Sequence, residues 1–151
     1  MRNLDEDFSM SMEIASIFIQ TGVLMSLLLW MMRRIQFKTG ALWLLFILYG
    51  VLLSIANSEP IAIANTTLAG LGVEILYRVI QPTPERRWRF QLFGFLAPMT
   101  IWILFYGFYL VTNIGGGLWF TGYVWLGTVF QSGFVGLVLA LFATSNEGDL
   151  Q

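Results

Sequence analysis

One acid and one base lie inside an apolar stretch of the chain. The run from 61 to 80 contains Glu74 and, four residues later, Arg78. In a helix this spacing places both side chains on one face, so we expect an ion pair between them. Inside a membrane an unpaired acid is costly, which makes Glu74 a candidate functional residue. Three roles stay open: an internal pair with Arg78 reaching toward water, a contact with a partner subunit or lipid, and a proton or ion relay.

Small side chains recur every fourth residue in the last apolar stretch. This helix-packing stripe consists of Thr128, Ser132, Gly136, Ala140 and Thr144. Small residues at this spacing let another helix approach closely within a membrane. The pattern does not distinguish a helix of the same chain from a helix of another subunit.

Aromatic residues cluster near the junction of the last two apolar stretches. They are Tyr106, Tyr109, Trp119, Phe120 and Tyr123. Tyrosine and tryptophan are typical of the membrane–water interface, and this is the simplest interpretation of the cluster. The same rings are candidate contacts for a lipid, a quinone or another flat apolar ligand.

The residue types that carry most catalytic and cofactor chemistry are missing from the sequence. With 0 Cys and 0 His, the chain has no disulfide, no thiolate nucleophile and no Ser–His pairing. We therefore expect no catalytic residues, no metal site and no cofactor of its own, a bound lipid being the one ligand anticipated. The formal net charge of -1 gives no indication of a nucleic-acid partner.

Composition predicts an integral membrane protein. The sequence is 57% hydrophobic and only 11% charged, and its apolar residues occur in long blocks. A hydrocarbon core about 30 Å thick requires roughly 20 helical residues, a length that several blocks reach. The expected fold is therefore all-α, a bundle of transmembrane helices.

Five apolar blocks predict five transmembrane helices in a single domain spanning residues 1–151. Ser58 and Pro60 separate the second block from the third, with Ser58 expected to cap the helix that follows. The basic loops are expected at 33–39 and 81–90. The predicted helices are 12–32, 40–56, 61–80, 91–111 and 118–143.

The basic residues predict the orientation of the bundle. Seven of the eight Lys and Arg residues fall on the side of the two basic loops, and Arg2 alone falls opposite. Because positive charge is retained on the cytoplasmic side, the N-terminus is expected outside and the C-terminus in the cytoplasm. A bacterial or archaeal plasma membrane, or an organellar inner membrane, would suit such a chain.

These features favour a structural or accessory subunit of a larger membrane complex, plausible hosts being electron-transfer, oxidase or monooxygenase assemblies. Its partners would be other integral membrane subunits and membrane lipids. One alternative is a small homo-oligomeric transporter or channel that uses Glu74, Thr67 and Asn65. Another is a module that binds a lipid or quinone at the aromatic cluster.

Overall fold

The described part of the chain contains five helices and no strands. The computed structural model describes the backbone of residues 4–112 and 123–145, and the side chains of these residues except 4–11, 13, 14, 123 and 124. The all-α prediction and the number of helices are confirmed over this part of the chain. The helices are α1 Leu4–Arg34, α2 Ala41–Asn57, α3 Ile61–Ile80, α4 Arg87–Thr112 and α5 Tyr123–Ser145.

Four of the helices are long and apolar enough to cross a membrane. The candidate spans are Ala15–Arg34, Ile61–Ile80, Arg87–Thr112 and Trp125–Ser145. They indicate an integral membrane protein, as the composition predicts. Helix α2 is apolar but has 17 residues, which corresponds to about 26 Å and falls short of the roughly 30 Å hydrocarbon core.

The helix boundaries differ from the prediction mainly at the N-terminal ends. Helix α1 begins at Leu4 instead of residue 12, because acids at positions 5–7 suit the first turn of a helix. Helix α4 begins at Arg87 instead of residue 91. Proline disfavours a helical backbone at the residue before it, and no proline follows Pro84 until Pro98, so a helix can begin soon after Pro84. Helix α1 also ends at Arg34 instead of residue 32, so both loops are shorter than predicted, at 35–40 and 81–86. Helix α5 continues to Ser145, and residues 118–122 of the predicted fifth helix lie outside the described residues.

A tight turn joins α2 to α3, but its capping differs from the prediction. Ser58 has a left-handed backbone (φ 57°), and its N–H bonds to the carbonyl oxygen of Ser54, so Ser58 ends α2. Pro60 is the N-cap of α3, and its fixed φ suits the start of a helix. The predicted role of Ser58 as the cap of α3 is therefore wrong.

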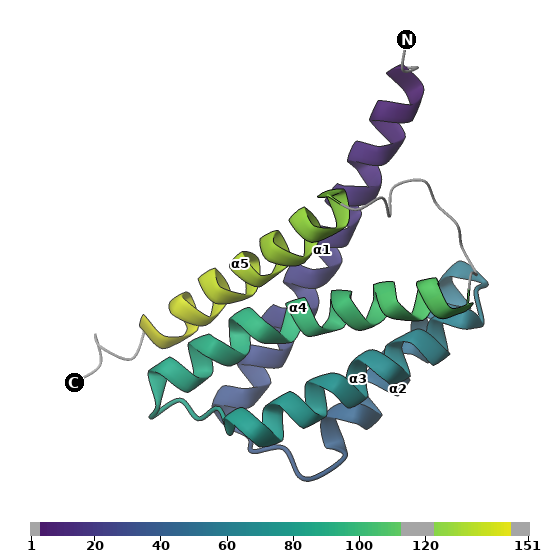
Figure 1. Ribbon diagram of the computed structural model, residues 1–151. Coiled ribbons are helices and arrows are strands. Elements are labelled where there is room, and N and C mark those ends of the chain that lie inside the picture. Colours follow the sequence, from purple (N-terminus) through teal and green to yellow (C-terminus); the bar gives the residue numbers. More distant parts are fainter. Residues whose placement is uncertain (1–3, 113–122, 146–151) are drawn as a thin grey trace.

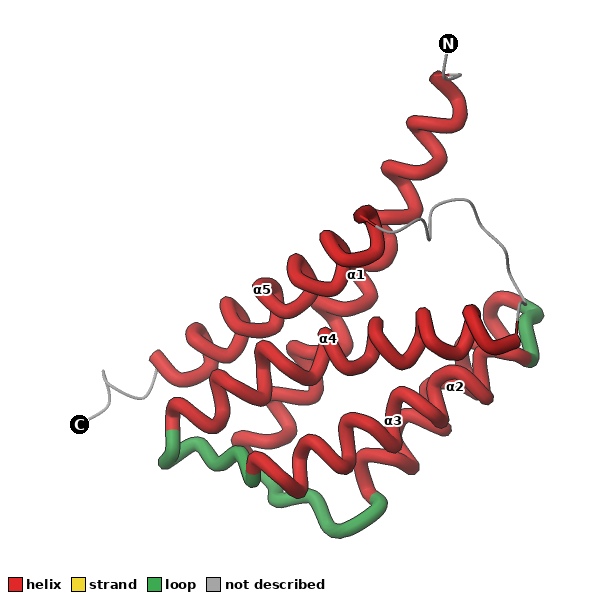
Figure 2. The backbone as a smooth tube through the Cα atoms, viewed as in Figure 1, coloured by secondary structure: helices red, strands yellow, loops and turns green. Residues whose placement is uncertain are grey.

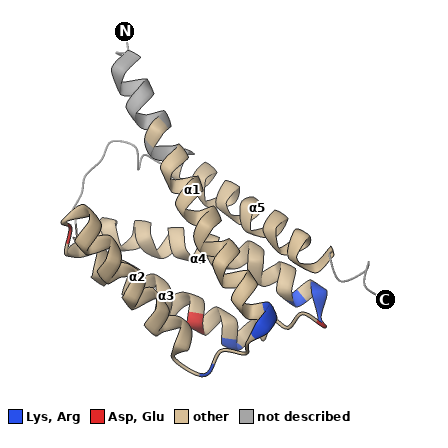
Figure 3. Ribbon diagram, turned by 180° about the vertical axis from the view of Figure 1, so that it is seen from behind, with Lys and Arg blue, Asp and Glu red and all other residues tan. Residues whose placement is uncertain are grey.

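The helices pack in sequence order with one exception. Helix α3 packs between α2 and α4, and α4 packs on α5. Helix α1 is the exception, because it packs along α5 and crosses α4 (Figure 1). The two loops 35–40 and 81–86 lie at one end of the bundle, and the α2–α3 turn lies at the opposite end (Figure 2). Lys and Arg gather at the first of these ends (Figure 3). We call it the basic end and the other the far end.

The hydrophobic core is divided unequally between the two halves of the bundle. A large cluster fills the half near the basic end and reaches the middle of the bundle; it includes Leu28, Phe46, Val73 and Phe93, each no more than 1% exposed. A small cluster of Ile17, Trp102 and Val129 lies toward the far end. The basic half is therefore the better packed part of the molecule.

Candidate functional site

Glu74 is buried, and both of its carboxylate oxygens are hydrogen-bonded. Oε1 accepts from the backbone N–H of Gly40 at 2.9 Å and from Arg78 Nε at 2.9 Å. Oε2 accepts from the backbone N–H of Leu42 at 3.1 Å. The structure thus contains the Glu74–Arg78 ion pair and adds two backbone donors from another part of the chain.

These donors belong to the first turn of α2, which explains why an acid is suitable there. The first N–H groups of any helix lack partners within the helix, and the helix dipole gives that end partial positive charge. The residue before α2 is Gly40, which has no side chain to cap it and adopts φ 83°. Glu74 of α3 supplies the missing acceptors and so acts as a cap donated by a neighbouring helix.

Two further side chains of α3 hold the same loop. Arg78 donates from its second guanidinium nitrogen to the carbonyl oxygen of Phe37 at 3.2 Å. The Tyr77 hydroxyl accepts from the N–H of Phe37 at 3.2 Å, and its ring packs edge-on against Phe37 and Phe93. We call Glu74, Tyr77 and Arg78 the α3 clamp. It binds the 35–40 loop and the start of α2 to α3.

The clamp borders a polar pocket at the basic end. This pocket has a volume of about 280 Å³. The Arg78 side chain is 38% exposed, whereas that of Glu74 is only 9% exposed. The arginine therefore reaches toward the surface while the carboxylate stays inside. The pocket is lined by Gln36, Phe37, Tyr77, Arg78, Gln81, Pro82 and Thr83.

The small-residue stripe of α5 faces α4 of the same chain. All five stripe residues, Thr128, Ser132, Gly136, Ala140 and Thr144, are buried. A side chain added at Gly136 would collide with the Gly94 carbonyl oxygen and with Pro98. Thr144 donates to the carbonyl oxygen of Ala140 at 3.0 Å within its own helix. Of the two uses left open by the pattern, the structure shows packing within the chain.

The aromatic cluster is described only in part. Tyr106 stacks on Trp125 with ring centroids 4.3 Å apart, which links α4 to α5. Tyr109 packs on Phe105 with centroids 4.8 Å apart. Trp119 and Phe120 lie outside the described residues, as does the side chain of Tyr123.

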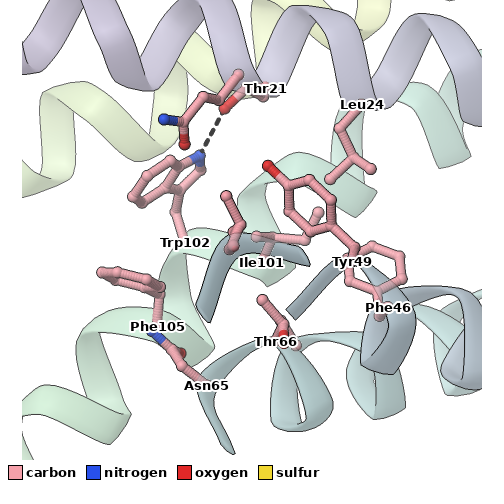
Figure 4. A pocket seen from close by; sticks show the side chains of 12 residues that line it. Thr21, Leu24, Phe46, Tyr49, Asn65, Thr66, Ile101, Trp102 and Phe105 are labelled. Carbon is pink, nitrogen blue, oxygen red and sulfur yellow. Dashed lines mark hydrogen bonds between the residues drawn. The ribbon is translucent and has the colours of Figure 1, made fainter. Parts of the chain in front are cut away.

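A cavity of about 80 Å³ lies between α1, α2, α3 and α4 in the far half (Figure 4). Asn65 of α3 lines it and is 3% exposed. On the α1 and α4 side, Trp102 Nε1 donates to Thr21 Oγ1 at 3.1 Å. The sequence does not predict this cavity, because its walls come from four helices and no single helix shows a pattern for it.

The three residues proposed for transport do not line one path in the described structure. Asn65 lines the cavity, and Glu74 belongs to the clamp. Thr67 donates to the carbonyl oxygen of Ile63 at 2.6 Å within α3. The described residues also contain no group of three or more His, Cys, Asp or Glu that could hold a metal ion.

The backbone partners of Glu74 were not predicted from the sequence either, although the sequence contains an indication of them. A helix start preceded by Gly40 lacks the Ser, Thr, Asp or Asn that usually caps it. An uncapped helix start and a buried acid on a neighbouring helix are complementary.

Comparison with protein-family models, curated proteins and solved structures gives no match for this chain.

Proposed function

We propose that this chain is a structural or accessory subunit of a larger membrane complex, with no chemistry of its own. The observation that carries the proposal is the α3 clamp. Both carboxylate oxygens of Glu74 accept hydrogen bonds. The donors are two backbone N–H groups at the start of α2 and the side chain of Arg78. A carboxylate used in this way supports the fold, whereas a relay needs one that exchanges protons with further titratable groups.

The length of α1 also supports an assembly role. Helix α1 runs over 31 residues from Leu4 to Arg34, more than the roughly 20 that a crossing needs. Figure 1 shows α1 extending beyond the other helices. Such an extension offers a surface to a neighbouring subunit. Electron-transfer, oxidase and monooxygenase assemblies are the hosts that we consider first.

The proposal includes an orientation with five crossings. In this arrangement α2 also spans, the basic end faces the cytoplasm, and the N-terminus is outside. The gathering of Lys and Arg at one end supports it (Figure 3). A bacterial or archaeal plasma membrane or an organellar inner membrane fits this orientation.

Single cysteines test the orientation, because the chain has 0 Cys of its own. Lys38→Cys, Ser58→Cys and Ser145→Cys place thiols at exposed positions of the two ends. A membrane-impermeant maleimide added outside intact cells should label position 58 and leave 38 and 145 unlabelled until the cells are opened. Identical labelling at 38 and 58 would show that α2 does not cross.

Native mass spectrometry tests the subunit proposal itself. The protein is extracted from its own membrane in a mild detergent, and every co-migrating chain is identified. Stable association with larger membrane subunits is the expected result. A homo-oligomer without other chains would overturn it and favour the transporter alternative, which ion flux in proteoliposomes would then examine.

Substitution of Glu74 separates assembly from activity in the host complex. For Glu74→Gln we expect a lower yield of assembled complex, while turnover per assembled complex stays near that of the wild type. Normal assembly with abolished turnover would mean that the carboxylate takes part in the reaction.

A further inference from the structure

The cavity in the far half contains a buried polar group without a partner. Asn65 is 3% exposed, and no donor within the described part of the chain reaches its Oδ1. A buried acceptor left without a hydrogen bond costs about 1–3 kcal/mol. A polar group of this kind in the wall of a cavity is suited to a ligand that brings the missing donor.

The rest of the cavity wall is mainly apolar and aromatic. Phe46, Ile101 and Phe105 contribute hydrophobic surface (Figure 4). The indole N–H of Trp102 is already bonded to Thr21. The other polar side chains of the wall are those of Gln20, Thr21, Tyr49 and Thr66, and the hydroxyls of Thr21 and Thr66 already make hydrogen bonds within the chain. The lining therefore suits a molecule that is mostly hydrocarbon and has one small polar group.

The position of the cavity indicates where such a molecule would come from. Asn65 is four residues from the start of α3, which is about 6 Å below the far end of that helix. On the α1 and α2 side of the wall, Gln20 is exposed, and Leu24, Tyr49 and Leu53 are partly exposed. The cavity therefore opens sideways between α1 and α2, at the depth where lipid head groups meet acyl chains.

We propose that this cavity binds a single-chain amphiphile with a hydroxyl head, and that Asn65 Oδ1 accepts a hydrogen bond from that hydroxyl. The volume of about 80 Å³ accommodates the head and the first part of one chain, and the remaining chain lies in the opening between α1 and α2. The occupant enters from the lipid, so no aqueous route is needed. This inference does not depend on whether the chain is an accessory subunit.

Photolabelling of the full chain in phosphatidylcholine nanodiscs tests the proposal. The probe is hexadecanol carrying a diazirine in its chain, and its methyl ether is the matched probe that lacks the donor. The alcohol should label peptides that line the cavity, saturably and in competition with unlabelled hexadecanol. Since the ether cannot donate to Asn65, it should label these peptides about fivefold less.

Two variants locate the interaction. Asn65→Leu keeps a side chain of similar size and removes the acceptor, so labelling by the alcohol should fall to the level of the ether. Gln131→Leu makes the same change of amide to hydrocarbon at an exposed position of α5, and it should leave labelling unchanged. If Asn65→Leu does not fold, the two probes on the wild-type protein decide the matter alone.

Labelling that rises linearly without saturation would overturn the proposal. Equal saturable labelling by the alcohol and the ether would overturn it too, because the cavity would then be a hydrocarbon site or would hold water at Asn65. Equal labelling of wild-type protein and Asn65→Leu by the alcohol would exclude the amide as the acceptor.

Discussion

The two halves of this bundle treat buried polar groups in opposite ways. Near the basic end, Glu74 has three donors on its two oxygens and lies beside the large core cluster. In the far half, Asn65 Oδ1 has no donor within the described residues and lies beside a cavity and the small cluster. Both residues belong to the same helix, α3, so the difference comes from what surrounds that helix.

The difference shows which polar groups a membrane bundle must satisfy. An uncompensated buried charge destabilises a fold by about 3–5 kcal/mol, whereas a neutral acceptor without a partner costs about 1–3 kcal/mol. A small protein tolerates the second more readily than the first. The charged group is therefore built into the fold, and the neutral amide is left available for a ligand.

Removal of the Glu74 carboxylate should produce the largest loss of stability. In Glu74→Leu the N–H groups of Gly40 and Leu42 lose their acceptor and Arg78 loses its partner. The free energy of unfolding should fall by about 3 kcal/mol, and by about half as much in Glu74→Gln, which keeps one amide oxygen. Unfolding by SDS in mixed micelles measures both changes.

The matched control is Glu59→Gln. Glu59 is exposed in the α2–α3 turn, so its substitution should change stability by less than about 0.5 kcal/mol. Equal losses of unfolding free energy in Glu74→Gln and Glu59→Gln would contradict this prediction. The clamp acid would then stabilise the fold no more than an exposed acid does.

Close packing of α4 on α5 should give the next largest effect. In Gly136→Ala the added methyl group meets the carbonyl oxygen of Gly94, so the helices must separate and stability should fall by about 1–3 kcal/mol. Gly127 lies on the same helix, and no described atom lies within 4 Å of a Cβ added there. Gly127→Ala should therefore be neutral or stabilising by up to about 1 kcal/mol, since alanine favours helix. Changes of the same sign in both variants would argue against this packing.

The sequence was most informative where one helix carries the whole signal. The five helices follow from apolar blocks separated by prolines and charges, and the pairing of Glu74 with Arg78 follows from a spacing of four residues within one helix. The burial of the α5 stripe follows from its own period. Each of these patterns can be read from consecutive residues, because helical geometry fixes their relative positions.

The sequence was least informative where several helices contribute. The cap that Glu74 provides joins residues 32 to 34 positions apart, and the bond between Trp102 and Thr21 joins residues 81 positions apart. Neither separation follows from helical periodicity, since each depends on how the helices are arranged. The cavity has walls from four helices and could not be predicted for the same reason.

Loss of the Tyr77 hydroxyl should have a smaller effect that is confined to the basic half. In Tyr77→Phe the N–H of Phe37 loses its acceptor, while the ring contacts with Phe37 and Phe93 remain. We expect a loss of about 0.5–1.5 kcal/mol and faster hydrogen exchange in residues 35–42. The control is Tyr49→Phe at the cavity, which should leave exchange in this loop unchanged. Unchanged exchange in Tyr77→Phe would remove Tyr77 from the clamp.

Substitution of Asn65 should have an effect no larger than that of Tyr77, and its sign should be opposite to that of Glu74. In protein depleted of lipid by detergent exchange, Asn65→Leu removes an acceptor that has no donor, so the free energy of unfolding should rise by about 1 kcal/mol. Added hexadecanol should then stabilise the wild type more than the variant, because only the wild type has an acceptor for the hydroxyl. Thermal unfolding with and without the alcohol measures both effects, and Gln131→Leu is the control for a general gain from a more apolar surface. A loss of stability in Asn65→Leu without alcohol would mean that the amide already has a partner, and the contrast between the two halves of α3 would then disappear.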